Sequence, residues 1–190
     1  DNAVELDGGQ INVRFWNNRM EYTYRSISFA PCISGPGYAF LNLVAHPGDQ
    51  FFRAGTAFKM GSHPRNWGLD LVFYNTVVGP TSAGLKNSAK PFPVSDRRIF
   101  SQNNLSARPG DYLDPSGGWV AKPVEGAIVF RDAERGDYRL AAGSAGVDQA
   151  EALLGSGRIA KGKDSDLGLY ELGAGSDGLM PERTSGMRVW

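Results

Sequence analysis

Short apolar runs that end at an asparagine recur along the first half of the chain. In each, the run is followed by Asn, one further residue and another apolar residue, and the four segments are 13–20, 38–44, 71–77 and 99–105. The asparagines taken as equivalent are Asn18, Asn42, Asn75 and Asn103, which gives spacings of 24, 33 and 28 residues. A period in this range with uneven insertions is typical of solenoid proteins.

A second set of short strands follows the same period. Its equivalent positions are Glu5, Ser28, Lys59 and Lys86, with spacings of 23, 31 and 27 residues. Because side chains alternate between the two faces of a strand, the apolar positions of this set are expected to point inward. These are Val4, Leu6, Ile27, Phe29, Phe58 and Met60. Asp1, Glu5, Asp7, Ser28 and Lys59 would then share the outward face.

Strands this short cannot bury their apolar faces alone, so successive repeats are expected to stack and to pair strand on strand. Asn at a strand end tolerates the left-handed conformation and turns a corner. Stacked asparagine side chains could also hydrogen-bond along their column. The pattern therefore predicts an all-β solenoid made of short-strand coils.

Four segments of the chain resemble the right-handed parallel β-helix proteins, the pectate-lyase-like superfamily. They are 1–8, 73–79, 130–148 and 166–171, and Ala145-Gly146 departs from the Pro-Ala that is more typical there. The resemblance implies an all-β, right-handed parallel β-helix over residues 1–148. Residues 149–190 would form an irregular closing segment and capping tail. Since the group includes lyases, hydrolases, epimerases, depolymerases and non-enzymatic adhesins, it points to a fold more than to one activity.

Composition excludes several classes of partner. Lys plus Arg is 20 and Asp plus Glu is 20, so a formal net charge of zero gives no electrostatic footprint for nucleic acid or anionic lipid. No apolar run approaches the ~20 residues that span a bilayer, so no membrane partner is expected. Cys32 is the single cysteine and is interpreted as a small buried hydrophobic residue. The resemblance implies a secreted protein, extracellular or periplasmic.

The first strand carries a candidate metal site. Asp1, Glu5 and Asp7 alternate onto one face, where three carboxylates repel one another and a cation would relieve them. Oxygen ligands of this kind suit Ca²⁺. The alternative is a solvated acidic face paired with neighbouring Lys or Arg.

Residues near this face could support β-elimination of an acidic polysaccharide, the lyase reaction. Ca²⁺ or Arg25 would neutralise the substrate carboxylate, Lys59 would take the C5 proton, and Tyr24 or Arg53 would protonate the leaving oxygen. The alternative for Lys59 is a solubilising residue on an exposed strand. Tyr22, Ser28 and Asp49 are further candidates for substrate binding near this groove. Trp16 is a fourth candidate, expected to point outward on the asparagine-bearing face, where it could stack on a sugar ring; the alternative is that it covers an edge or contacts a long loop.

Two classes of function remain open from the sequence. One is a secreted protein that binds or degrades polysaccharide, and the other is a non-enzymatic structural or adhesive β-helix that forms rods or fibres. In either case the 4–7 strand begins at most three residues into the chain, so little precedes it that could cover the first coil. We therefore expect further β-helix at that end, as a missing N-terminal portion, a second chain or stacked copies.

Overall fold

In the computed structural model, fourteen strands and a single turn of 3₁₀ helix make up the regular structure of the described residues. These residues are 2–48, 55–60, 67–79, 85–87, 99–106, 126–153, 162–170 and 172. The first twelve strands fall into three parallel sheets of four strands each.

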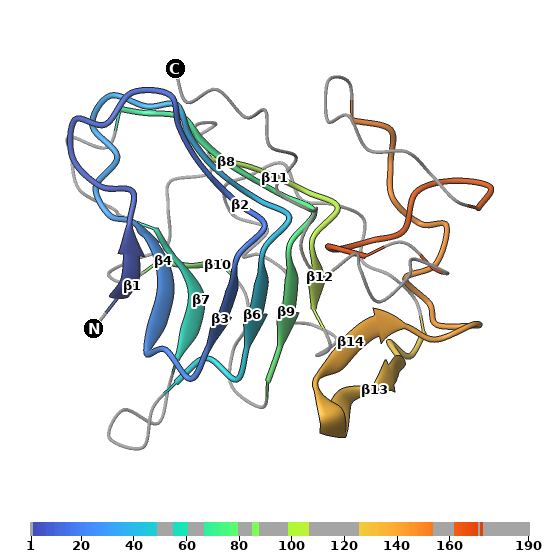
Figure 1. Ribbon diagram of the computed structural model, residues 1–190. Helices are drawn as coiled ribbons and strands as arrows, with labels where there is room; N and C mark the ends of the chain where they lie inside the picture. The colour runs from blue at the N-terminus through green and yellow to red at the C-terminus, as the bar shows by residue number, and fades with distance from the viewer. Residues whose placement is uncertain are drawn as a thin grey trace, which may run out of the picture.

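The chain visits the three sheets in rotation (Figure 1). The first pass is β1 (Asn2–Glu5), β2 (Val13–Trp16) and β3 (Arg19–Glu21). The second is β4 (Arg25–Phe29), β5 (Gly37–Phe40) and β6 (Leu43–Ala45). The third is β7 (Thr56–Met60), β8 (Asp70–Phe73) and β9 (Thr76–Val78). The fourth is β10 (Leu85–Asn87), β11 (Ile99–Gln102) and β12 (Leu105–Ser106).

Each strand lies beside its counterpart from the pass before. The orders are β1-β4-β7-β10 in the first sheet, β2-β5-β8-β11 in the second and β3-β6-β9-β12 in the third. In the first sheet, Glu5, Ser28, Lys59 and Lys86 are direct neighbours across the strands. This register, predicted from spacing alone, is confirmed.

The core lies between the three sheets. Met20, Val44 and Val77 of the third sheet meet Ala39 and Val72 of the second there. The first sheet contributes the residues predicted to point inward: Leu6, Ile27, Phe29, Phe58 and Met60 are buried, and Val4 packs against them while half-buried. Burial of this alternating set confirms the predicted inward face.

An asparagine ladder joins the second sheet to the third. Asn18 donates to Oδ1 of Asn42 from both its backbone N and Nδ2, at 3.1 Å each. Asn42 donates to Asn75 in the same way at 3.0 Å, and Asn75 to Asn104 at 2.9 and 2.8 Å. Hydrogen bonding along the column is thus confirmed, but its last member is Asn104 and the prediction of Asn103 is wrong.

The residue before each ladder asparagine turns the corner. Asn17, Leu41, Tyr74 and Asn103 all have φ between 53° and 57°. The expectation that the ladder asparagines adopt this left-handed conformation is therefore wrong by one residue. Left-handed Leu and Tyr cost about 1–2 kcal/mol each, and the buried ladder bonds offset that cost.

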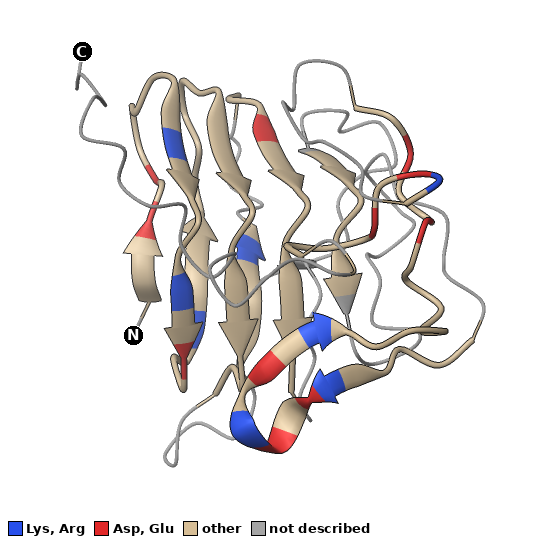
Figure 2. Cartoon of the chain, turned by 45° about the vertical axis from the view of Figure 1, so that its right-hand side comes forward, with Lys and Arg blue, Asp and Glu red and all other residues tan. Residues whose placement is uncertain are grey.

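Described residues beyond β12 pack on the outer face of the third sheet. β13 (Phe130–Asp132), η1 (Ala133–Arg135) and β14 (Asp137–Leu140) form an antiparallel hairpin, not a further parallel pass. Tyr138 of β14 packs with Tyr170 against Leu43, Ala45 and Val78. Figure 2 shows charged residues gathered on this hairpin, while the parallel sheets carry few.

Candidate functional site

The outward face of the second sheet is dominated by aromatic and apolar side chains. Val13 and Phe15 of β2 pack into the core, so Arg14 and Trp16 between and after them face outward. The register then builds two columns, Arg14–Tyr38–Leu71–Phe100 and Trp16–Phe40–Phe73–Gln102. We call these eight residues the outer aromatic face.

Rings in the second column stack face to face. The centroids of Trp16 and Phe40 are 5.7 Å apart with ring planes 2° from parallel, and those of Phe40 and Phe73 are 4.9 Å apart at 9°. In the first column the Arg14 guanidinium lies 5.5 Å from the Tyr38 ring centroid. The ring face of Trp16 that points away from Phe40 ends the stack, and Trp16 is 39% exposed.

This arrangement can bind a flat, partly apolar ligand. Trp16 supplies a partly exposed ring and an indole N–H, Tyr38 a hydroxyl and Arg14 a cation. Sugar rings, with apolar faces bordered by hydroxyls, match this combination.

Among the predicted substrate-binding residues, Tyr22 lies beside the third sheet, at the end of its first strand. It directly follows β3, is 68% exposed and stacks on His46 with centroids 5.2 Å apart. The His46 Nε2 atom is 3.0 Å from the hydroxyl of Tyr138, which also lies beneath the Arg19 guanidinium. Burial is the main cause that raises the pKa of Tyr138, and the charge of Glu21 adds to it.

Ser28 does not face solvent, so its predicted exposure is wrong. It is fully buried, and its hydroxyl donates to Asp7 Oδ2 at 3.1 Å. The other Asp7 oxygen accepts from the backbone N of Ala30 at 2.7 Å. Asp7 therefore stabilises the end of β4 with both carboxylate oxygens.

The predicted calcium ligands are only partly described. Glu5 is exposed and accepts from Asn2 Nδ2 at 2.7 Å, Asp7 is engaged as above, and Asp1 lies outside the described residues. No group of three or more His, Cys, Asp or Glu in the described part of the chain could hold a metal ion. Calcium binding stays a prediction.

The structure describes three of the four predicted catalytic residues, namely Tyr24, Arg25 and Lys59. Arg25 shares the strand alternation of Ile27, whereas Lys59 is the direct neighbour of Ser28, so Arg25 and Lys59 start from opposite faces of the first sheet. The Arg25 guanidinium lies 4.9 Å from the Tyr24 ring centroid, and its Nη2 donates to the Tyr24 hydroxyl at 3.4 Å. Arg53 and Asp49 lie outside the described residues.

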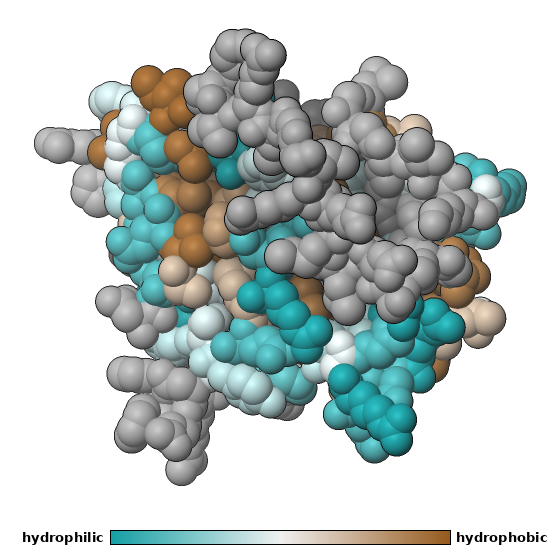
Figure 3. Space-filling model, in the orientation of Figure 1, coloured by the Kyte–Doolittle hydropathy of each residue, from teal (hydrophilic) through white to brown (hydrophobic). Residues whose placement is uncertain are grey.

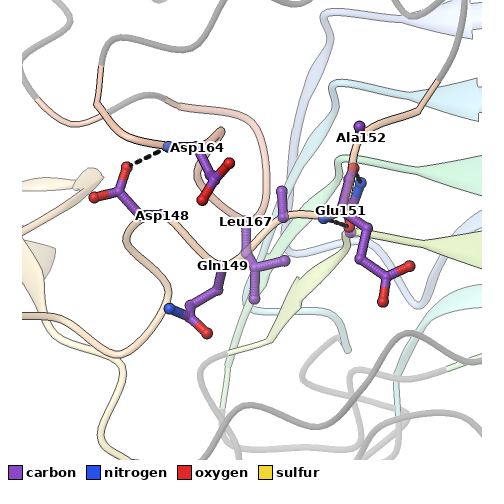
Figure 4. Close-up of a pocket in the computed structure, with 8 residues that line it drawn as sticks. Asp148, Gln149, Glu151, Ala152, Asp164 and Leu167 are labelled. Carbon is purple, nitrogen blue, oxygen red and sulfur yellow. Dashed lines mark hydrogen bonds between the residues drawn. The ribbon is translucent and has the colours of Figure 1, made fainter.

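An acidic pocket that the sequence did not suggest lies beside the end of the second sheet. It has a volume of about 410 Å³ and is lined by 148–152, Asp164, Leu167 and Asn103. In Figure 4, Asp148 and Asp164 lie on one side of Leu167 and Glu151 on the other. Asp148 Oδ1 accepts from the backbone N of Asp164, and Glu151 Oε2 accepts from Gln102. Asp148 therefore satisfies a donor of the closing segment and Glu151 a donor of β11, and the acids do not converge on one point.

Cys32 is buried, in agreement with its interpretation from sequence. It is fully buried, and burial together with a hydrogen bond to Asp70 raises the pKa of its thiol to about 12. Gln10 Nε2 also donates to its sulfur at 3.3 Å.

Comparison with protein-family models, curated proteins and solved structures finds no match. Function is therefore argued from the geometry of this chain. Among the described residues there is no helix with the length and apolar character needed to cross a membrane.

Proposed function

We propose that this chain is a right-handed parallel β-helix of the pectate-lyase-like kind, and that it binds polysaccharide on its outer aromatic face. Regular rotation through three parallel sheets, with an asparagine ladder at one corner, supports the fold. Connections between parallel strands of one sheet are right-handed in about 98% of cases, which supports the hand. A secreted location fits this proposal.

The observation that carries the binding proposal is the in-register aromatic column of Trp16, Phe40 and Phe73, in which Trp16 is exposed. Trp16 is the exposed ring of this column, whereas Phe40 and Phe73 are half-buried. A sugar ring on Trp16 would bring its hydroxyls within reach of Arg14 and Tyr38, which are neighbours across β2 and β5. The Arg14 cation favours an acidic sugar over a neutral one.

Affinity electrophoresis and calorimetry with polygalacturonate, alginate and a neutral glucan test the proposal. Trp16→Ala should weaken binding by about two- to tenfold, because a lost stacking contact is worth roughly 0.5–1.5 kcal/mol. Arg14→Ala should weaken binding of the acidic polymers alone, and less so at high salt. Tyr22→Ala is the control, since Tyr22 is an exposed aromatic of the same pass on another sheet.

Two results would contradict the proposal. If none of the polymers binds, the proposal is wrong. If Tyr22→Ala loses affinity and Trp16→Ala does not, the site lies on the third sheet. The same mixtures, followed by ultraviolet absorbance of the unsaturated product, test the lyase hypothesis separately. Cleavage that survives in Lys59→Ala would exclude Lys59 as the base.

A further inference from the structure

A row of outward side chains runs along β8 and continues beyond the first residue of that strand. From residue 67 to residue 73, exposed or half-buried positions alternate strictly with buried ones. The outward members are all apolar or aromatic: Trp67, Leu69, Leu71 and Phe73. Alternate side chains of an extended segment share one face. The outer aromatic face, which contains Leu71 and Phe73, therefore extends to Leu69 and Trp67.

Backbone contacts with the second pass hold this extension in place. Gly68 N donates to the Cys32 carbonyl at 2.9 Å, and Gly37 N donates to the Leu69 carbonyl at 2.9 Å. A Cβ on Gly68 would overlap the Cys32 sulfur, so a residue without a side chain is needed for this close approach. Trp67 directly precedes these contacts, and its backbone is therefore positioned by the sheet.

The exposed part of this row does not lie at an edge of the sheet. Trp67 is 66% exposed and Leu69 is 39% exposed, although β8 is an internal strand with β5 and β11 as its neighbours. A single exposed apolar side chain is common on protein surfaces, but these two continue a row of four. Figure 3 shows the surface of the β13–β14 hairpin as hydrophilic, so the hairpin beside the third sheet is a poorer stacking surface.

Trp67 and Trp16 lie toward opposite ends of the parallel strands. Trp67 precedes β8, whereas Trp16 is the last residue of β2. In the register of the sheet, Phe73 is the counterpart of Trp16 two strands away, and it follows Trp67 by six residues. At about 3.3 Å per residue and about 4.8 Å per strand, the two tryptophans are at most about 22 Å apart. One sugar ring cannot contact both, whereas a chain of several sugars can.

The residues between the two tryptophans suit an acidic polymer. Leu71 is the direct neighbour of Tyr38, and Tyr38 is the direct neighbour of Arg14, so a hydroxyl and a cation lie beside the apolar row. Neither the outer aromatic face nor its extension contains Asp or Glu, and Arg14 is their one charged member. A polymer that carries carboxylates therefore meets a cation between two aromatic contacts, with no like charge on this face to repel it.

We propose that Trp67 is a second stacking residue for polysaccharide, and that one acidic chain spans Trp67 and Trp16 with a carboxylate at Arg14. The inference rests on the proposed function, because it extends the same binding face. It adds a requirement of length: the site takes an internal stretch of the polymer and not a single terminal sugar. Two contacts on one chain reinforce each other, because the second forms within a complex that already exists.

Calorimetry with galacturonate and alginate oligomers, from disaccharide to octasaccharide, tests the length requirement. The affinity of the wild type should rise with length until one chain reaches both tryptophans, and then level off. Trp67→Ala should weaken binding of the octasaccharide by about two- to tenfold and remove most of the gain with length. Trp67→Phe should keep most of the affinity, because a ring remains. Tyr22→Ala is the matched control, since Tyr22 is 68% exposed and Trp67 is 66% exposed.

The results distinguish this inference from the proposed function. If neither the polymers nor any oligomer binds, both are wrong. If the octasaccharide binds and is weakened by Trp16→Ala but not by Trp67→Ala, the proposed function stands and the role of Trp67 is overturned. Equal affinity of the wild type for disaccharide and octasaccharide overturns the inference as well. The same holds if Tyr22→Ala loses as much affinity as Trp67→Ala.

Discussion

Replacement of Asn75 by Ala probes the asparagine ladder where it is most deeply buried. The Asn75 side chain is fully buried and holds neighbours on both sides. Its Oδ1 accepts from the backbone N and from Nδ2 of Asn42, and its Nδ2 donates to the Ala39 carbonyl at 2.9 Å and to Asn104 Oδ1 at 2.8 Å. Asn42 Nδ2 keeps a second acceptor, the Phe15 carbonyl, and Asn104 Oδ1 keeps the Asn75 backbone N.

The expected loss follows from the groups left without their ladder partner. The buried Asn42 backbone N–H and the Ala39 carbonyl lose the side chain that pairs with them. An unsatisfied buried polar group costs about 1–3 kcal/mol, and the small cavity adds to this. We expect Asn75→Ala to lower the free energy of unfolding by about 3 kcal/mol, which is roughly 6–12 °C in melting temperature for a chain of this size.

Asn18→Ala is the matched control, since Asn18 is the first described member of the same ladder. Asn18 is half-buried and its amide donates to Asn42 Oδ1 and to the Trp16 carbonyl, so water can replace much of what is lost. A cost of about 1 kcal/mol or less is expected. Urea unfolding followed by circular dichroism measures both variants. If Asn18→Ala costs as much as Asn75→Ala, burial is not what makes the ladder stabilising.

Three further outcomes are expected. Gly68→Ala should destabilise the fold by about 1–3 kcal/mol, because its Cβ would overlap the Cys32 sulfur. Gly9→Ala is the control and should be nearly neutral, because the nearest atom is 3.9 Å from the added Cβ. Equal melting temperatures of the two variants would refute the packing argument. With a thiol pKa of about 12, Cys32 should react with a disulfide reagent at pH 8 roughly a thousandfold more slowly than in the urea-unfolded chain; comparable rates would show that the thiol is not buried. The hydrogen bond from Arg139 lowers the pKa of Asp137, so its contribution, under about 1 kcal/mol, is complete above the ordinary Asp range and is lost as pH falls below it. Asp137→Asn should therefore flatten the acid side of the stability profile, and an unchanged profile would contradict this assignment.

Much of the strand arrangement was determined by the sequence alone. Alternation with period two fixes which residues face the core, and slipping a strand by one residue would expose all of them. For this reason spacing placed Glu5, Ser28 and Lys59 correctly side by side. At the last pass the argument failed by one residue, because Asn103 and Asn104 are adjacent and identical in type. Only their backbone conformations, left-handed at Asn103, separate the corner from the ladder.

The surroundings of each outward residue were decided by the tertiary structure. Ser28, Glu5 and Lys59 share one column, yet Ser28 is buried while Glu5 is exposed. Likewise, nothing in the sequence near Trp16 shows that its ring stacks on Phe40, which lies 24 residues away. The alternation of residues along a strand determines to which face of the sheet a side chain points. What covers that side chain depends on contacts between passes, and loops of unequal length set those contacts.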